Sequence, residues 1–168
     1  MKIKIYADGA DIDGMLSEYE KGIVEGFTTN SSLMKKAGVK DYKNFAKEVT
    51  DKIKDVSVSF EVFGDDFEIM KKEALILKEY GKNVFVKIPI QNTKGKSSIP
   101  LIKELSSLGV NLNVTAVFTI NQVKEIVNVV DENSNTIVSN FAGRLADIGI
   151  DPVPIMKESV NVIRTKKM

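Results

Sequence analysis

The stretch NVFVKIPI (83–90) is typical of a buried strand, yet it contains a lysine, Lys87. Alternation along a strand would put Lys87 and Phe85 on one face and the neighbouring valines on the other. On the inner face of a barrel the amine would be removed from water, which lowers the pKa of a lysine. A neutral amine can attack a carbonyl and form a Schiff base. The alternative is a lysine that extends from the strand end into solvent.

Two carboxylates occupy positions from which they could serve such a lysine. Asp8 follows the strand-like KIKIYA (2–7), and Glu61 lies inside VSVSFEVF (56–63). The chain contains neither histidine nor cysteine, so acid–base chemistry falls to aspartate, glutamate, lysine or tyrosine. A carboxylate in an apolar strand is costly unless it is used or paired. Glu61 is therefore predicted to be either an acid–base group or an ion-pair partner of Lys87.

Amide and hydroxyl side chains mark the C-terminal ends of other predicted strands. They could bind substrate hydroxyls or, for Thr115, hold a catalytic water, and turn or helix-cap chemistry is the alternative. For Ser31 and Ser32 we favour helix capping. The candidates for substrate binding are Thr28, Asn30, Asn113 and Ser139.

Arg144, in NFAGRLADIG (140–149), is one of only two arginines in a chain whose other basic residues are lysines. An arginine after a glycine at the end of a strand suits bidentate binding of a phosphate. The alternative is an ion pair with Asp147.

These residues need a scaffold, and the sequence alternates six times between strand-like and helical periodicity. Strands are predicted at 2–7, 24–30, 56–63, 83–90, 110–118 and 135–141. Helices are predicted at 11–23, 32–38, 44–55, 66–81, 98–109, 120–132 and 151–165. Strict alternation predicts a parallel sheet with right-handed crossovers. Gly22, Gly81 and Gly109 are expected to end helices in the left-handed conformation.

Two α/β architectures fit this order: a (β/α)8 barrel of the TIM type and an open doubly wound sheet. In a barrel all strand ends converge on one mouth, and polar residues at the end of every predicted strand favour it. A complete barrel typically needs about 250 residues. We therefore expect residues 1–168 to form one incomplete barrel domain with about six β/α units, cut short at its C-terminus. A genuine six-stranded open sheet is the alternative.

The composition suits one soluble domain with a core, since 43% of the 168 residues are hydrophobic and the net charge is +1. The near-zero charge gives no reason to expect a nucleic acid or a membrane as partner. The absence of cysteine and histidine excludes disulfides, Cys- or His-ligated metals and a Ser-His-Asp triad. The polar N-terminus does not resemble a signal peptide and no apolar run approaches about 20 residues, so a cytoplasmic location is expected.

Six segments, in order, resemble the transaldolase family of class I aldolase barrels, and especially its short bacterial branch, which includes fructose-6-phosphate aldolase. The resemblance covers nearly the whole chain. The segments are YADGA with Asp8, GFTTNSSL with Asn30, FEV with Glu61, VFVKIPI with Lys87, LNVTAVF with Asn113 and Thr115, and SNFAGRLADIG with Ser139, Phe141 and Arg144.

The resemblance implies a role for each catalytic candidate. Lys87 would form the Schiff base with the ketose donor, and Glu61 would act through a water that Thr115 positions. Asp8 would take the proton from the substrate hydroxyl as the C–C bond breaks. No metal or organic cofactor would be needed.

The same resemblance implies the substrates and how they are held. These would be fructose 6-phosphate, sedoheptulose 7-phosphate and aldose phosphates of the pentose phosphate pathway. Arg144 would hold the phosphate, and the dihydroxyacetone unit would be bound by Thr28, Asn30, Asn113, Ser139 and Phe141.

Two positions favour transaldolase over the stand-alone aldolase, which has glutamine and tyrosine where this chain has Glu61 and Phe141. Ser31 replaces the family's proline in TTNPS, and the family's seventh strand, with a serine and a basic residue for the phosphate, is not in this sequence. A homo-oligomer is expected, because an incomplete barrel has edges to cover. The alternatives are an aldolase-type C–C lyase, and a non-catalytic truncated barrel that only oligomerises or binds sugar phosphate.

Overall fold

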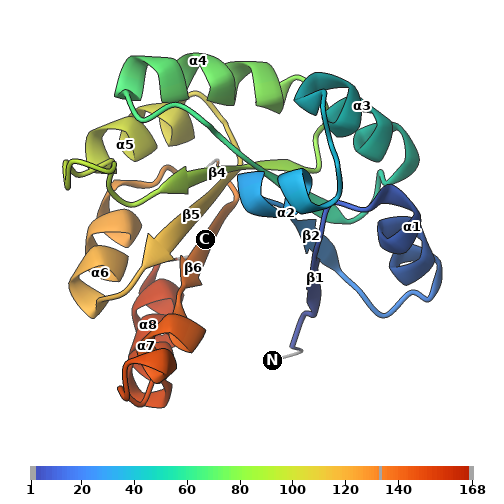
Figure 1. Cartoon of the computed structure of the whole chain (residues 1–168). Coiled ribbons are helices and arrows are strands. Elements are labelled where there is room, and N and C mark those ends of the chain that lie inside the picture. The colour runs from blue at the N-terminus through green and yellow to red at the C-terminus, as the bar shows by residue number, and fades with distance from the viewer. Residues whose placement is uncertain (1–2, 133, 167–168) are drawn as a thin grey trace.

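In the computed structural model, which describes residues 3–132 and 134–166, strands and helices alternate along the chain (Figure 1). The strands are β1 (Tyr6–Asp8), β2 (Gly26–Thr28), β3 (Ser57–Glu61), β4 (Val84–Pro89), β5 (Leu112–Val117) and β6 (Thr136–Asn140). The helices are α1 (Ile12–Glu20), α2 (Ser31–Lys36), α3 (Tyr42–Lys52), α4 (Phe67–Lys78), α5 (Ile99–Ser107), α6 (Ile120–Val129), α7 (Ala142–Asp147) and α8 (Val153–Thr165).

The six strands are all parallel and pair in chain order from β1 to β6. A doubly wound sheet would reverse its strand order at a switch point, whereas sequential order is that of a barrel. Figure 1 shows the sheet curled, with α1, α3, α4, α5, α6 and α8 in an arc outside it. Within the described residues, β1 and β6 each have a partner strand on one side only. The fold is therefore of the α/β-barrel type with six units, and the doubly wound alternative is wrong.

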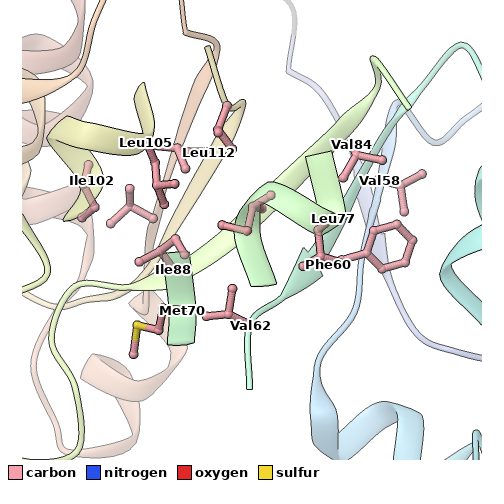
Figure 2. Close-up of a cluster of buried hydrophobic side chains, with 14 of the residues drawn as sticks. Val58, Phe60, Val62, Met70, Leu77, Val84, Ile88, Ile102, Leu105 and Leu112 are labelled. Carbon is pink, nitrogen blue, oxygen red and sulfur yellow. The ribbon is translucent and has the colours of Figure 1, made fainter. Parts of the chain in front are cut away.

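The main core lies between the strands and the outer helices (Figure 2). Every second residue of β3 and β4 points into it, because side chains alternate across a strand. Val58 and Phe60 of β3 and Val86 of β4 are fully buried, and Met70 and Leu77 of α4 cover them. The other face carries Ser57, Ser59 and Glu61 of β3, and Lys87 of β4 together with Phe85.

Most predicted elements are confirmed, with shorter strands than expected. The short helix α7 was not predicted, unlike α2 of the same length, because Gly143 in its first turn disfavours a helix. Gly22 and Gly109 have the expected positive φ, at 66° and 68°, but Gly81 does not. Helix α4 ends earlier, and the N–H of Tyr80 already bonds to the carbonyl of Leu77.

Strand β5 is irregular at its C-terminal end. Its register with β6 shifts between Val114 and Val117, and Ala116 has a φ of 57°, in the left-handed region. Among the described residues it is the one non-glycine residue with positive φ. A bulge of this kind re-aims neighbouring side chains, and the neighbour here is Thr115.

None of the helices in the described part of the chain is both long and apolar enough to cross a bilayer.

Candidate active site

Lys87 lies on the β4 face opposite to Val84, Val86 and Ile88, which are buried under the helices. The lysine is itself only 9% exposed, and its Nζ donates a hydrogen bond to the backbone carbonyl of Thr29 at 3.1 Å. A side chain that extended into solvent would not be buried in this way, so that alternative is wrong. Within residues 3–132 and 134–166, no ion pair involves this amine.

Glu61 ends β3 and is the register partner of Lys87 on β4. The two side chains do not form an ion pair, so the predicted alternative of a structural salt bridge is not realised. Burial raises the pKa of the Glu61 carboxyl above its ordinary value, while the Lys87 ammonium and the N–H of Ser31 act to lower it. The charge of Asp8 adds to the rise. A partly buried carboxyl with a raised pKa is a candidate general acid–base group.

Asp8 ends β1, next to Thr28 at the end of β2. The hydroxyl of Thr28 donates to Oδ1 of Asp8 at 2.8 Å, which orients the carboxylate. The Asp8 charge also acts on Glu61. These two carboxyls therefore lie near enough to influence each other across the first three strands.

Asn113 lies beside Lys87 on β5 and is 1% exposed. Its amide nitrogen donates to the hydroxyl of Ser59 at 3.1 Å, and its oxygen accepts from the hydroxyl of Ser139 at 2.7 Å. The three side chains connect β3, β5 and β6 across the inner face of the sheet. The structure thus brings Asn113 and Ser139 together. Lys87 belongs to the same group, because its strand, β4, lies between β3 and β5.

Thr115 and Asn30 keep hydrogen-bonding capacity that no described residue uses. Thr115 is 3% exposed, and its hydroxyl has no partner in the described part of the chain. Asn30 caps α2, because its side-chain oxygen accepts from the N–H of Leu33 at 2.9 Å, while its amide nitrogen is left over. The helix cap is therefore Asn30, and Ser31 and Ser32, predicted as caps, are the first helical residues.

The last two candidates lie after β6. The ring of Phe141 packs edge-on against Phe118, with centroids 5.5 Å apart. Arg144 is exposed and pairs with Asp147 at 3.5 Å, which is the predicted alternative. Its role in phosphate binding stays a prediction.

Three residues at the site were not among the predictions. Ser59 stands two positions before Glu61, so strand alternation could have placed it on the same face. Thr29 acts through its backbone carbonyl, for which side-chain chemistry gives no signal. The phenol of Tyr42, on α3, donates to the backbone carbonyl of Glu61 at 2.9 Å, and only the tertiary structure brings them together.

Two solved structures share the fold. Phosphoribosyl anthranilate isomerase from Thermococcus kodakaraensis is 18% identical, with a TM-score of 0.57 over 98% of this chain and 76% of that one. Dihydrodipicolinate synthase from Rhodopseudomonas palustris is 15% identical, with a TM-score of 0.56 over 96% of this chain and 67% of that one. At these identities the likeness shows an α/β-barrel fold.

Relatives at higher identity include two proteins with the same name. A "Probable transaldolase" of Thermoanaerobacter sp. (strain X514) is 35% identical over 160 residues, which are 95% of this chain and 69% of the relative. A "Probable transaldolase" of Clostridium kluyveri (strain ATCC 8527) is 32% identical over 166 residues, 99% of this chain and 73% of the relative. The family model described as transaldolase/fructose-6-phosphate aldolase matches residues 5–168. The chain therefore belongs to the transaldolase/fructose-6-phosphate aldolase family.

Proposed function

We propose that this protein is a transaldolase, which transfers a dihydroxyacetone unit between sugar phosphates through a Schiff base on Lys87. The observation that carries the proposal is the buried amine of Lys87, which forms no ion pair with any described residue and is flanked in register by Glu61 and Asn113. An amine in this setting serves as a nucleophile toward a carbonyl. The family and the names of the relatives support aldol chemistry.

The proposed reaction begins when the amine of Lys87 adds to the ketose carbonyl. The carbinolamine loses water to give the iminium, with Glu61 moving the protons through a water that Thr115 holds. Asp8 then accepts the proton of the substrate hydroxyl as the C–C bond breaks. The enamine that remains on Lys87 adds to the aldehyde of the acceptor, and hydrolysis frees the new ketose. Asp8 gives its proton to the new hydroxyl as the enamine adds to the acceptor aldehyde, so the complete cycle returns the protein to its starting protonation state.

The polar network around Asn113 suits the dihydroxyacetone unit. Its amide is already oriented by Ser59 and Ser139. Together with Thr28, Asn30 and Phe141, these groups would contact the donor, while Arg144 would leave Asp147 to bind the phosphate. The exposed ion pair is easily exchanged, since such pairs stabilise by only about 0–1 kcal/mol.

Borohydride trapping tests the proposal. Protein incubated with fructose 6-phosphate and sodium borohydride should gain one reduced dihydroxyacetone or hexose adduct, located on Lys87 by peptide mass spectrometry. The other lysines of the same sample, such as the exposed Lys124, serve as internal controls. A folded protein that forms no adduct on Lys87 would rule out Schiff-base catalysis.

Acceptor dependence separates a transaldolase from the aldolase alternative. With fructose 6-phosphate alone, release of glyceraldehyde 3-phosphate should stop near one equivalent per active site, because the enamine has no acceptor. Adding erythrose 4-phosphate should restore turnover. Continuous release without an acceptor would identify the aldolase instead.

A further inference from the structure

Tyr42 is the first residue of α3 and lies against the end of β3. Its ring packs edge-on against Phe60 and Phe63, with centroids 6.1 and 4.8 Å away. Its hydroxyl donates to the backbone carbonyl of Glu61 at 2.9 Å. The tyrosine therefore contacts Phe60, directly before Glu61, and Phe63, two positions after it, as well as the Glu61 carbonyl.

The hydrogen bond replaces one that the sheet cannot make. The carbonyl of Ser59 accepts from the N–H of Thr29 on β2 at 3.1 Å. Two residues further along β3, the carbonyl of Glu61 would face the N–H of residue 31 if β2 continued. Ser31 instead begins α2, and its N–H lies near enough to the Glu61 carboxyl to act to lower the pKa of that carboxyl. The phenol of Tyr42 supplies the missing donor.

Packing alone explains the ring of Tyr42 but not its hydroxyl. A phenylalanine would keep both aromatic contacts, whereas only the hydroxyl satisfies the Glu61 carbonyl. Burial, with smaller contributions from the charges of Glu61 and Glu73, raises the pKa of Tyr42. The phenol thus stays protonated, and remains a donor, over the whole range in which Glu61 titrates.

We propose that Tyr42 is a positioning residue for Glu61: its phenol pins the last peptide of β3 and so holds the carboxyl in its half-buried place opposite Lys87. It acts through the backbone of Glu61 and does not touch the substrate. The inference rests on the proposed function in so far as Glu61 is the acid–base group.

The variant Tyr42→Phe tests the inference. The ring at position 42 should still pack against Phe60 and Phe63. The value of kcat should nevertheless fall about tenfold, because small displacements of a catalytic group have large effects on rate. KM should change by less than about twofold, since ground-state binding is untouched. The matched control is Tyr19→Phe, which removes a phenol hydrogen bond to Asp55 elsewhere on the surface and should leave kcat unchanged.

A second readout does not depend on activity. The side-chain carboxyl of Glu61 can be titrated by NMR in protein labelled with 13C at glutamate, with Glu61→Gln identifying its signal. A carboxyl that is no longer held in its buried place should titrate at lower pH, by about half a pH unit in Tyr42→Phe, because its burial is the main cause of the raised value. Tyr19→Phe should match the wild type.

The outcomes separate this inference from the proposed function. A wild-type protein that forms no adduct on Lys87 defeats the proposed function, and the NMR titration then decides the role of Tyr42 by itself. An unchanged Glu61 titration in folded Tyr42→Phe overturns the inference, even if that variant is less stable. If Tyr42→Phe does not fold, Asp41→Ala takes its place, because Asp41 caps α3 and fixes its first turn. It should move the titration in the same direction by a smaller amount, and no movement would overturn the inference.

Discussion

The two ends of the sheet use the same kinds of polar side chain in opposite ways. At the N-terminal end, Asn83, Asn111 and Asn135 each directly precede a strand. Asn83 donates to the carbonyls of Ile53 and Val56, at 2.9 and 2.8 Å. Asn111 donates to the carbonyl of Lys82 at 3.0 Å and accepts from Asn135 at 3.0 Å. The side-chain amides of these residues form hydrogen bonds that hold the strands to the preceding loops.

At the C-terminal end the polar groups are only partly satisfied. Thr115 and the amide nitrogen of Asn30 have no partner in the described part of the chain, and the Lys87 amine has a single backbone acceptor. A hydrogen-bonding group that has no partner inside a buried site costs stability unless a ligand supplies the partner. The difference supports the proposal that the C-terminal end, where barrels place their active sites, carries the chemistry, although Ser57 at the start of β3 also has a buried hydroxyl without a partner.

The strongest test of this contrast is Lys87→Met, which should leave the fold intact and remove at least about 10⁴-fold of the transaldolase activity, as loss of a nucleophile does. Coupled assays of glyceraldehyde 3-phosphate release measure it. Lys124→Met, at an exposed position, should keep full activity. Residual activity near the wild-type level would mean that the C-terminal end is not the catalytic one.

Glu61→Gln should lower kcat by about 10²- to 10⁴-fold, the range for loss of a general acid–base group. The same substitution should increase the free energy of unfolding, although it lowers kcat. Since burial raises the pKa of Glu61, the folded protein keeps this proton to a higher pH than the unfolded chain does. Wild-type stability is thus lost as the pH rises from about 4.3, the ordinary glutamate value, through the raised one.

Glutamine cannot ionise, so the variant should escape this loss. Urea unfolding at a series of pH values should show Glu61→Gln more stable than the wild type above that window and equal to it below. A variant that is less stable at neutral pH would show that the charge of Glu61 stabilises the fold. Glu61 would then no longer support the contrast between the two ends of the sheet.

At the other end of the sheet, Asn83→Ala should cost about 1–3 kcal/mol of unfolding free energy, because two partly buried carbonyls lose their donor. The activity per folded molecule should not change. Asn128→Ala, on the exposed face of α6, is the control and should stay within about 0.5 kcal/mol of the wild type. A large loss of activity in Asn83→Ala would blur the division between the two ends.

The smallest effect is expected at the bulge of β5. Ala116→Gly relieves the left-handed strain, about 1–2 kcal/mol for a residue with Cβ, but adds the flexibility of glycine. In thermal unfolding, the stability of Ala116→Gly should be equal to or slightly higher than that of the wild type. Ala7→Gly, in regular β1, should be about 1 kcal/mol less stable than the wild type. Equal losses in both variants would show that no strain is stored beside Thr115.

Strand alternation was sufficient to predict the inner face, which is why Lys87, Glu61 and Asn113 lie side by side as expected. Polar residues at every strand end correctly favoured sequential strand order. The alternatives for Arg144 and Asn30 turned on short-range partners, Asp147 and Leu33, that the sequence also contained. Either reading was compatible with the sequence, since a side chain in a helix cap or ion pair looks the same before the fold is known.

The remaining features depend on contacts between distant segments. The Thr29 carbonyl reaches Lys87 over 58 residues, and the Tyr42 phenol meets a backbone group that every residue possesses. The left-handed Ala116 has no sequence signal, because glycine or asparagine would be expected there. Such features follow from how the β/α units pack, which local periodicity does not encode.

The strictly sequential pairing of the strands also has a consequence for folding during synthesis. Each strand joins the one that precedes it in the chain, so every new β/α unit finds its docking partner already synthesised. Units can therefore be added one at a time as the polypeptide emerges from the ribosome, with β1 as the template for all that follow.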